Sequence, residues 1–128
     1  MKYAIQVNSS PCQANSADTA YQFIKAALEM GHEVVRVFFY QEGGYHAFRY
    51  AAPPDDEQQF VARWSALAQE FNVDLVVCIS AAQRRGLLEA NEAKRVGKVD
   101  NDVADGFRIA GLGQWVESVL LADRYIEF

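Results

Sequence analysis

The segment Val73–Gly86, with the sequence VDLVVCISAAQRRG, constrains the fold more than any other part of the chain. It begins with an apolar run that is too short for a helix and is typical of a strand buried on both faces. The run ends at Cys78, and a helix-prone segment containing Arg84 and Arg85 follows it. Backbone N–H groups and guanidinium charges at such a junction favour a thiolate over a thiol. Cys78 is therefore the candidate chemical centre.

Strands and helices alternate along the whole chain. Strands are predicted at 2–7, 32–40, 73–78, 107–110 and 124–128, and helices at 17–28, 55–71, 79–85, 87–96 and after residue 113. This alternation implies right-handed βαβ units and a parallel sheet covered on both faces. We expect one domain over residues 1–128, a three-layer α/β/α fold with a five-stranded parallel sheet in the flavodoxin-like order 2-1-3-4-5.

That strand order predicts where a site would lie. Ligands in parallel sheets bind at the carboxyl ends of the strands, where the order of the strands reverses. In the order 2-1-3-4-5 the reversal lies between the first and third strands. The loop after the first contains Cys12, and the loop after the third begins at Cys78. We expect the two loops to meet there.

Composition excludes several classes of function. Of the 128 residues 51% are hydrophobic and 23% charged, as in ordinary globular proteins, and the formal net charge is −5. An acidic chain without a basic cluster is a poor direct ligand for nucleic acid. No apolar run approaches the roughly 20 residues of a membrane span, and the N-terminus lacks a signal-peptide pattern. We expect a cytoplasmic protein with free thiols.

Cys78 has two other interpretations. Unpaired cysteine is among the most buried residue types, so Cys78 could be a small apolar core residue of a non-catalytic scaffold. Cys78 and Arg84 also have the Cys-x5-Arg spacing of phosphatases and arsenate reductases. That chemistry needs a loop of inward-facing N–H groups, which usually requires glycine, and residues 79–83 contain none. Arg85 also occupies the position where a Ser or Thr would assist the leaving thiolate.

The remaining candidate residues carry weaker signals. Cys12 could form a redox pair with Cys78, although a lone loop cysteine is the simpler interpretation. His32 is interpreted as structural, and His46 lies in a glycine-rich loop from which it could approach a thiol. Neither histidine has metal-ligand spacing to the cysteines, and the loop after the first strand lacks the glycines of a flavin site. We expect no metal and no cofactor.

Three aromatic residues lie in the segment after the strand predicted at 32–40, and this segment has neither helical nor strand periodicity. It consists of Tyr45, Phe48 and Tyr50. Exposed aromatic residues often mark subunit interfaces, and we interpret this group as one.

Three motifs resemble the DsrE/TusD family of sulfurtransferase subunits. They are FFYQEG at 38–43, CISAAQRRG at 78–86 and GLG at 111–113. The resemblance extends over essentially the whole chain, including Tyr21-Gln22-Phe23 and Gly31-His32-Glu33. Cys12 is not part of the family pattern and inherits no role.

The resemblance implies a DsrE-like fold and a sulfur-relay function. Cys78 would accept sulfane sulfur as a persulfide. Apart from the resemblance, the start of the helix after Cys78 suits the persulfide anion, with Ser80 and either Arg84 or Arg85 as the candidate side chains. The implied assembly is a dimer of heterotrimers with TusB/TusC-like or DsrF/DsrH-like subunits. A TusA-like protein would be the sulfur donor and a TusE-like or DsrC-like protein the acceptor. The pathway is either 2-thiolation of the tRNA wobble uridine or dissimilatory sulfur oxidation; both remain open.

Overall fold

The structure is a computed structural model that describes residues 1–13 and 15–128. Ala14, in the loop predicted after the first strand, lies outside the described residues. The elements in chain order are β1 (Lys2–Val7), α1 (Ser16–Glu29), β2 (Glu33–Phe39), the 3₁₀ helix η1 (Gln41–Ala47), α2 (Phe60–Phe71), β3 (Leu75–Cys78), α3 (Ile79–Arg84), α4 (Ala90–Arg95), β4 (Phe107–Ala110), α5 (Leu112–Leu121) and β5 (Arg124–Glu127).

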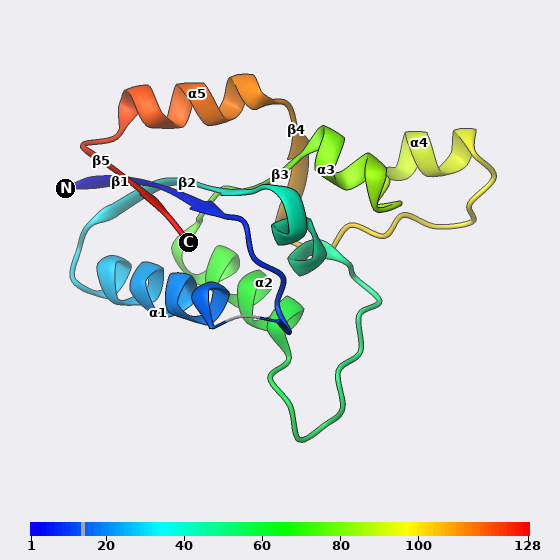
Figure 1. The fold of residues 1–128 in the computed structure, drawn as a ribbon, viewed down its shortest axis with the longest axis horizontal. Coiled ribbons are helices and arrows are strands. Elements are labelled where there is room, and N and C mark those ends of the chain that lie inside the picture. The colour runs from blue at the N-terminus through cyan, green and yellow to red at the C-terminus, as the bar shows by residue number, and fades with distance from the viewer. Residues whose placement is uncertain (14) are drawn as a thin grey trace.

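The predicted α/β architecture is confirmed. All five strands pair in parallel and form one sheet. Helices α1 and α2 cover one face of this sheet, and α5 lies on the other (Figure 1). Helices α3 and α4 continue from the carboxyl end of β3, and α4 lies beyond the edge strand β4 (Figure 1). None of the helices in the described part of the chain has the length and apolar character that crossing a membrane requires.

The strand order differs from the predicted 2-1-3-4-5. The sheet has the order β4-β3-β2-β1-β5, so the reversal lies between β1 and β5. In right-handed crossovers, the face that carries the connecting helix fixes the direction in which the next strand is added. Because α1 and α2 lie on the same face, β1, β2 and β3 follow one another across the sheet. Helix α5 lies on the opposite face, and it returns the chain to the far side of β1.

Two further predictions need correction between β2 and α2. The loop predicted after β2 forms the 3₁₀ helix η1. The helix predicted from residue 55 begins only at Phe60, because the Gln59 side chain donates to the carbonyl oxygens of Pro53, Pro54 and Glu57 and holds that segment in a turn. Gly43 is required in η1, since an added Cβ would overlap the carbonyl group of Val7.

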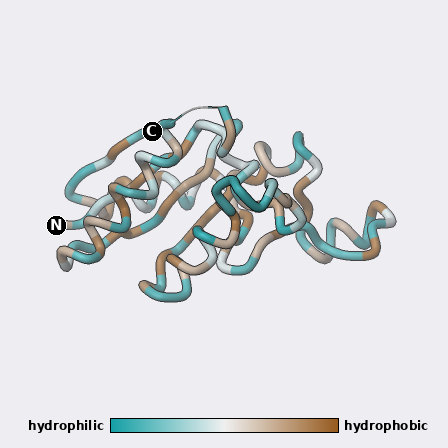
Figure 2. Tube along the Cα trace, turned by 90° about the horizontal axis from the view of Figure 1, so that it is seen from below, coloured by the Kyte–Doolittle hydropathy of each residue, from teal (hydrophilic) through white to brown (hydrophobic). Residues whose placement is uncertain are grey.

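The alternation of side chains along the strands produces two cores. The larger core lies on the α1 and α2 side and includes Ile5, Val7, Val37, Phe39, Leu75, Val77 and Trp64. The smaller core lies on the α5 side and contains Phe38, Val76, Cys78 and Ala81. Figure 2 shows hydrophobic and hydrophilic segments interspersed along the Cα trace.

His46 is a buried polar residue of the larger core. Its side chain packs against Phe39, Phe60 and Trp64. The indole Nε1 of Trp64 donates to its Nδ1 at 3.1 Å, so the proton is on Nε2, which donates to the carbonyl oxygen of Ser9 at 3.1 Å. His46 therefore joins η1, α2 and the loop after β1, and it lies on the opposite side of the sheet from Cys78.

The protonation of His46 should make stability depend on pH. Burial lowers the pKa of His46 to about 4. The charge of Arg63 also lowers this pKa, whereas the hydrogen bond to Ser9 raises it. Between the ordinary pKa of about 6.5 and pH 4 the unfolded chain binds a proton that the folded chain does not. We expect the free energy of unfolding to fall by about 3 kcal/mol over this range.

Urea denaturation at a series of pH values measures this loss. His46→Gln removes the titrating group and leaves every other ionisable side chain in place. The variant should lose less stability than the parent between pH 6.5 and pH 4, and parallel curves would contradict the assignment.

Candidate functional site

Cys78 lies at the junction that the sequence predicts. It is the last residue of β3 and directly precedes the first residue of α3, with no loop between them. Its neighbours in the sheet are β2 on one side and β4 on the other, where it pairs with Ala110. The backbone therefore brings the thiol to the carboxyl edge of the sheet, next to the first turn of a helix.

The Cys78 side chain is covered by apolar groups. The residue is 2% exposed and packs in the smaller core with Phe38, Ala81 and the partly buried Tyr40 and Trp115. Within the described chain its sulfur has no hydrogen-bond partner, so the immediate surroundings of the thiol are apolar. Trp115 belongs to α5, and its ring lies 5.9 Å from that of Phe38.

Arg85 is turned toward η1. Its Nη2 donates to Glu42 Oε1 at 2.5 Å and its Nη1 to the carbonyl oxygen of Ala81 at 3.1 Å. The guanidinium group also lies 5.6 Å from the centre of the Tyr45 ring. Its charge is thus compensated by a carboxylate, and these contacts tie α3 to η1.

Ser80 and Arg84 are both exposed on α3. They are four residues apart, which places them on one face of the helix. In the described residues neither side chain has a hydrogen bond or an ion pair, in contrast to Arg85. Of the two arginines, Arg84 is therefore the one without a partner among the described residues.

The structure does not support an anion loop of the Cys-x5-Arg type. Residues Ile79–Arg84 form an α-helix. Their N–H groups point along the helix axis instead of converging on one point. The spacing of Cys78 and Arg84 is therefore a consequence of the helix that joins them.

The two thiols are not brought together as predicted. Cys12 follows β1 and Cys78 ends β3, and β2 lies between these strands. Cys12 is exposed, Cys78 is buried, and both are free thiols. The prediction failed because it depended on the strand order 2-1-3-4-5, in which β1 and β3 are neighbours. Within the described residues, no group of His, Cys, Asp and Glu side chains is arranged to hold a metal.

An ion network that the sequence analysis missed ties α5 to the sheet. Asp74, just before β3, accepts hydrogen bonds from Arg36 at 2.6 Å and from Arg108 at 2.8 Å. Arg36 also donates to Glu117 and to the carbonyl oxygen of Gln114, both on α5. Burial alone would raise the pKa of Asp74, but the two arginines outweigh it and hold that pKa below its ordinary value. The sequence signal was a charged residue on each of β2, β4 and α5.

The outer side of α5 is more apolar than expected for a solvent-exposed helix face. Leu112, Val116 and Leu120 are spaced at four-residue intervals and are all at least half exposed. The sequence analysis recognised the apolar residues of this helix but not which of them face outward, because Trp115 and Ser118 occupy the side turned toward the sheet.

Comparisons with known proteins agree with this architecture. The model of the DsrE/DsrF-like family matches residues 1–128. The crystal structure of the ychN protein from E. coli matches with a TM-score of 0.80 at 19% sequence identity. The match covers 100% of this chain and 99% of the ychN chain. At that identity the likeness concerns the fold alone.

Several curated relatives are similar over their full length. A putative sulfurtransferase DsrE of Allochromatium vinosum is 49% identical over 128 residues, covering 100% of this chain and 98% of the relative. A sulfurtransferase TusD homolog of Vibrio vulnificus is 41% identical with the same coverage, and a sulfurtransferase TusD of an Enterobacter species is 38% identical with both chains fully covered. With a thiol at the end of β3 and a family match over the entire chain, this protein belongs to the DsrE/DsrF-like family.

Proposed function

We propose that this protein is a sulfurtransferase that carries sulfane sulfur as a persulfide on Cys78. The observation that carries the proposal is the position of Cys78, at the carboxyl edge of the sheet and directly before the first turn of α3. The relatives named as sulfurtransferases, similar over the full chain, support the same activity.

The reaction is a pair of exchanges at sulfur. The Cys78 thiolate attacks the outer sulfur of a donor persulfide, D–S–SH, and a new S–S bond forms while that of the donor breaks. The donor cysteine leaves as a thiolate with the bonding electron pair, and Cys78–S–SH remains. An acceptor thiolate then attacks the outer sulfur, and Cys78 leaves as a thiolate. Neither step has net oxidation, so no cofactor is required.

Groups on α3 are suited to stabilise the persulfide anion. The N–H groups in the first turn of a helix have no partner within the helix and carry partial positive charge. Ser80 lies in that turn and Arg84 one turn further, both exposed. We assign the stabilising charge to Arg84, because Arg85 is paired with Glu42. Arg85 then acts by holding α3 in position.

Access to Cys78 requires a change in its cover. With 2% exposure, the sulfur is closed to a protein donor until Trp115 or Tyr40 moves. The same burial supports a second candidate function, a scaffold subunit in which Cys78 is an inert core residue. The reactivity of Cys78 in the folded protein distinguishes the two.

The finer assignments follow from the family resemblance. We propose assembly with two related small subunits into a dimer of heterotrimers, a TusA-like donor and a TusE-like or DsrC-like acceptor, all in the cytoplasm. The names of the relatives include both DsrE and TusD, which supports either sulfur oxidation or tRNA thiolation as the pathway.

Cys78→Ser should abolish sulfur uptake. After incubation with a persulfide donor protein, intact mass should show one added sulfur on the parent, located on Cys78 by peptide mapping, and none on the variant. Cys12→Ser is the matched control and should retain full uptake. Equal loss in both variants would indicate a dithiol mechanism instead.

Trp115→Ala should expose the thiol. Removing the indole ring opens the apolar cover, so we expect iodoacetamide to label Cys78 about tenfold faster in the folded protein. Val116→Ala, an exposed neighbour outside that cover, should leave the rate unchanged. If Cys78 reacts only on unfolding in all three proteins, the scaffold function is favoured.

Substitution of Arg84 should affect the transfer rate, whereas substitution of Arg85 should affect the stability of the fold. Arg84→Gln should slow persulfide transfer several-fold while leaving the urea midpoint unchanged, since its side chain is exposed. Arg85→Gln should lower the free energy of unfolding by about 1 kcal/mol, because it breaks the contacts to Glu42 and Ala81. If Arg85→Gln slowed persulfide transfer in a single-turnover assay and Arg84→Gln did not, the stabilising charge would belong to Arg85 instead of Arg84.

A further inference from the structure

Tyr40 is the residue of β2 and its extension that the sheet places next to Cys78. The parallel pairing of β2 with β3 brings Phe39 opposite Val77, so the next position along both strands brings Tyr40 opposite Cys78. Tyr40 keeps extended backbone angles, φ −123° and ψ 155°, and its N–H donates to the carbonyl oxygen of Val7 at 2.9 Å. The geometry of the sheet therefore continues as far as Tyr40.

Tyr40 and Cys78 lie on the same face of the sheet. Side chains alternate along a strand, so Tyr40 shares its face with Phe38, and the two rings lie 6.5 Å apart. Phe38 and Cys78 belong to the smaller core, and Tyr40 is a partly buried residue packed against this core. Neighbouring strands are about 4.8 Å apart. Tyr40 and Cys78 are therefore neighbours at the carboxyl edge of the sheet.

The hydroxyl group of Tyr40 can take a hydrogen-bond partner from outside the chain. It has no partner among the residues that the structure describes, and it is not one of the fully buried polar atoms that lack a partner. The hydroxyl is therefore open to solvent, whereas Cys78 is only 2% exposed. A polar group thus lies at the rim beside a thiol whose other surroundings are apolar.

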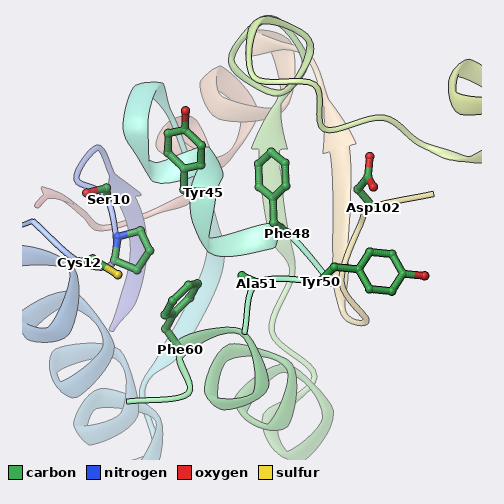
Figure 3. A pocket seen from close by; sticks show the side chains of 9 residues that line it. Ser10, Cys12, Tyr45, Phe48, Tyr50, Ala51, Phe60 and Asp102 are labelled. Atoms are coloured by element: carbon green, nitrogen blue, oxygen red, sulfur yellow. The ribbon is translucent and has the colours of Figure 1, made fainter. Parts of the chain in front are cut away.

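Two other tyrosines of this part of the chain belong to a different surface. Tyr45 and Tyr50 line a cavity together with Cys12 and Phe60 (Figure 3). This cavity opens beside the start of α2, which covers the opposite face of the sheet from α5 (Figure 1). The hydroxyl of Tyr50 is also hydrogen-bonded to Asp100.

Tyr125 lies on the same face as Tyr40, but its hydroxyl is already engaged. Its ring centre is 4.6 Å from that of Trp115 on α5. Its hydroxyl is hydrogen-bonded to Glu127 Oε2 at 2.6 Å and to Gln6 Oε1 at 3.2 Å. Tyr125 is therefore a matched control for Tyr40, since it has the same functional group on the same face but with partners inside the protein.

We propose that Tyr40 is a catalytic residue whose hydroxyl donates a hydrogen bond to the outer sulfur of the Cys78 persulfide. This inference rests on the proposed function of Cys78. Side chains stand roughly perpendicular to a sheet, and that of tyrosine is longer than that of cysteine, so the hydroxyl lies farther from the sheet than Sγ. An outer sulfur, bonded to Sγ at about 2.05 Å, extends beyond Sγ toward the level of the hydroxyl.

The hydrogen bond stabilises the loaded state of the protein. When the persulfide is ionised as Cys78–S–S⁻, its outer sulfur carries the charge, and hydrogen bonds to charged acceptors are the strong ones. The hydroxyl keeps its own proton, so no proton or electron is transferred. Because the hydroxyl lies at the level of the outer sulfur, the hydrogen bond is made after sulfur uptake, and it holds the sulfur on Cys78 until an acceptor thiolate attacks.

Competition between the parent and Tyr40→Phe for a limited amount of sulfur tests the proposal. Equal amounts of the two full chains are mixed with a limiting persulfide donor protein, through which sulfur exchanges until the distribution is constant. The chains differ by one oxygen atom, so intact mass resolves the loaded and unloaded forms of each, and peptide mapping counts the sulfur on Cys78. We expect the ratio of loaded to unloaded chain to be about tenfold higher for the parent, because the variant lacks a hydrogen bond to a charged group.

Tyr125→Phe is the control, and in the same competition it should share the sulfur equally with the parent. Both substitutions keep the aromatic ring and its packing. Equal sharing between the parent and Tyr40→Phe would overturn the role of Tyr40, and so would an equal deficit in both variants. If the parent itself takes up no sulfur on Cys78, the proposed function fails as well, so the two failures are distinguished.

Discussion

The burial of β3 on both faces of the sheet is the constraint on which the site depends. All four residues of β3 are buried, with Leu75 and Val77 in the larger core and Val76 and Cys78 in the smaller one. Because side chains alternate along a strand, the core that receives Val76 also receives Cys78. The candidate reactive atom therefore lies beneath α5 as a direct result of the strand register, at the edge of the sheet where α3 begins.

Local sequence patterns predicted the elements of this fold but not their order. The apolar run before Cys78 and the alternation of strands and helices were sufficient to predict five parallel strands between helices. The order across the sheet depends on which face each connecting helix occupies, and that is decided by long-range packing. In this protein the pairing of Arg36 with Asp74 and Glu117 ties α5 to the face opposite α1 and α2. Each of these charges is separated from the others by more than thirty residues.

In the candidate site, too, local features could be predicted and long-range contacts could not. The sequence predicted that Cys78 ends a strand and that a helix follows, since both are properties of neighbouring residues. It did not separate the roles of Arg84 and Arg85, because the partner that engages Arg85 is Glu42 in a distant 3₁₀ helix. Nor did it predict that Trp115 packs against the smaller core, which contains Cys78. His46 was misjudged for the same reason, since its partners, Trp64 and Ser9, come from separate segments.

The hydrogen bonds of Arg36 also limit how the cover over Cys78 can open. Its Nη1 group contacts Gln114 and Glu117, which flank Trp115 in the sequence of α5. The Gln114 backbone and the Glu117 side chain are thereby held to β2, and lifting the whole helix would break both of these contacts of the charged cluster. Rotation of the indole about its own side-chain bonds leaves that cluster intact. Side-chain rotation is faster than the displacement of a helix, so the thiol would be uncovered in brief, frequent events rather than in rare large ones.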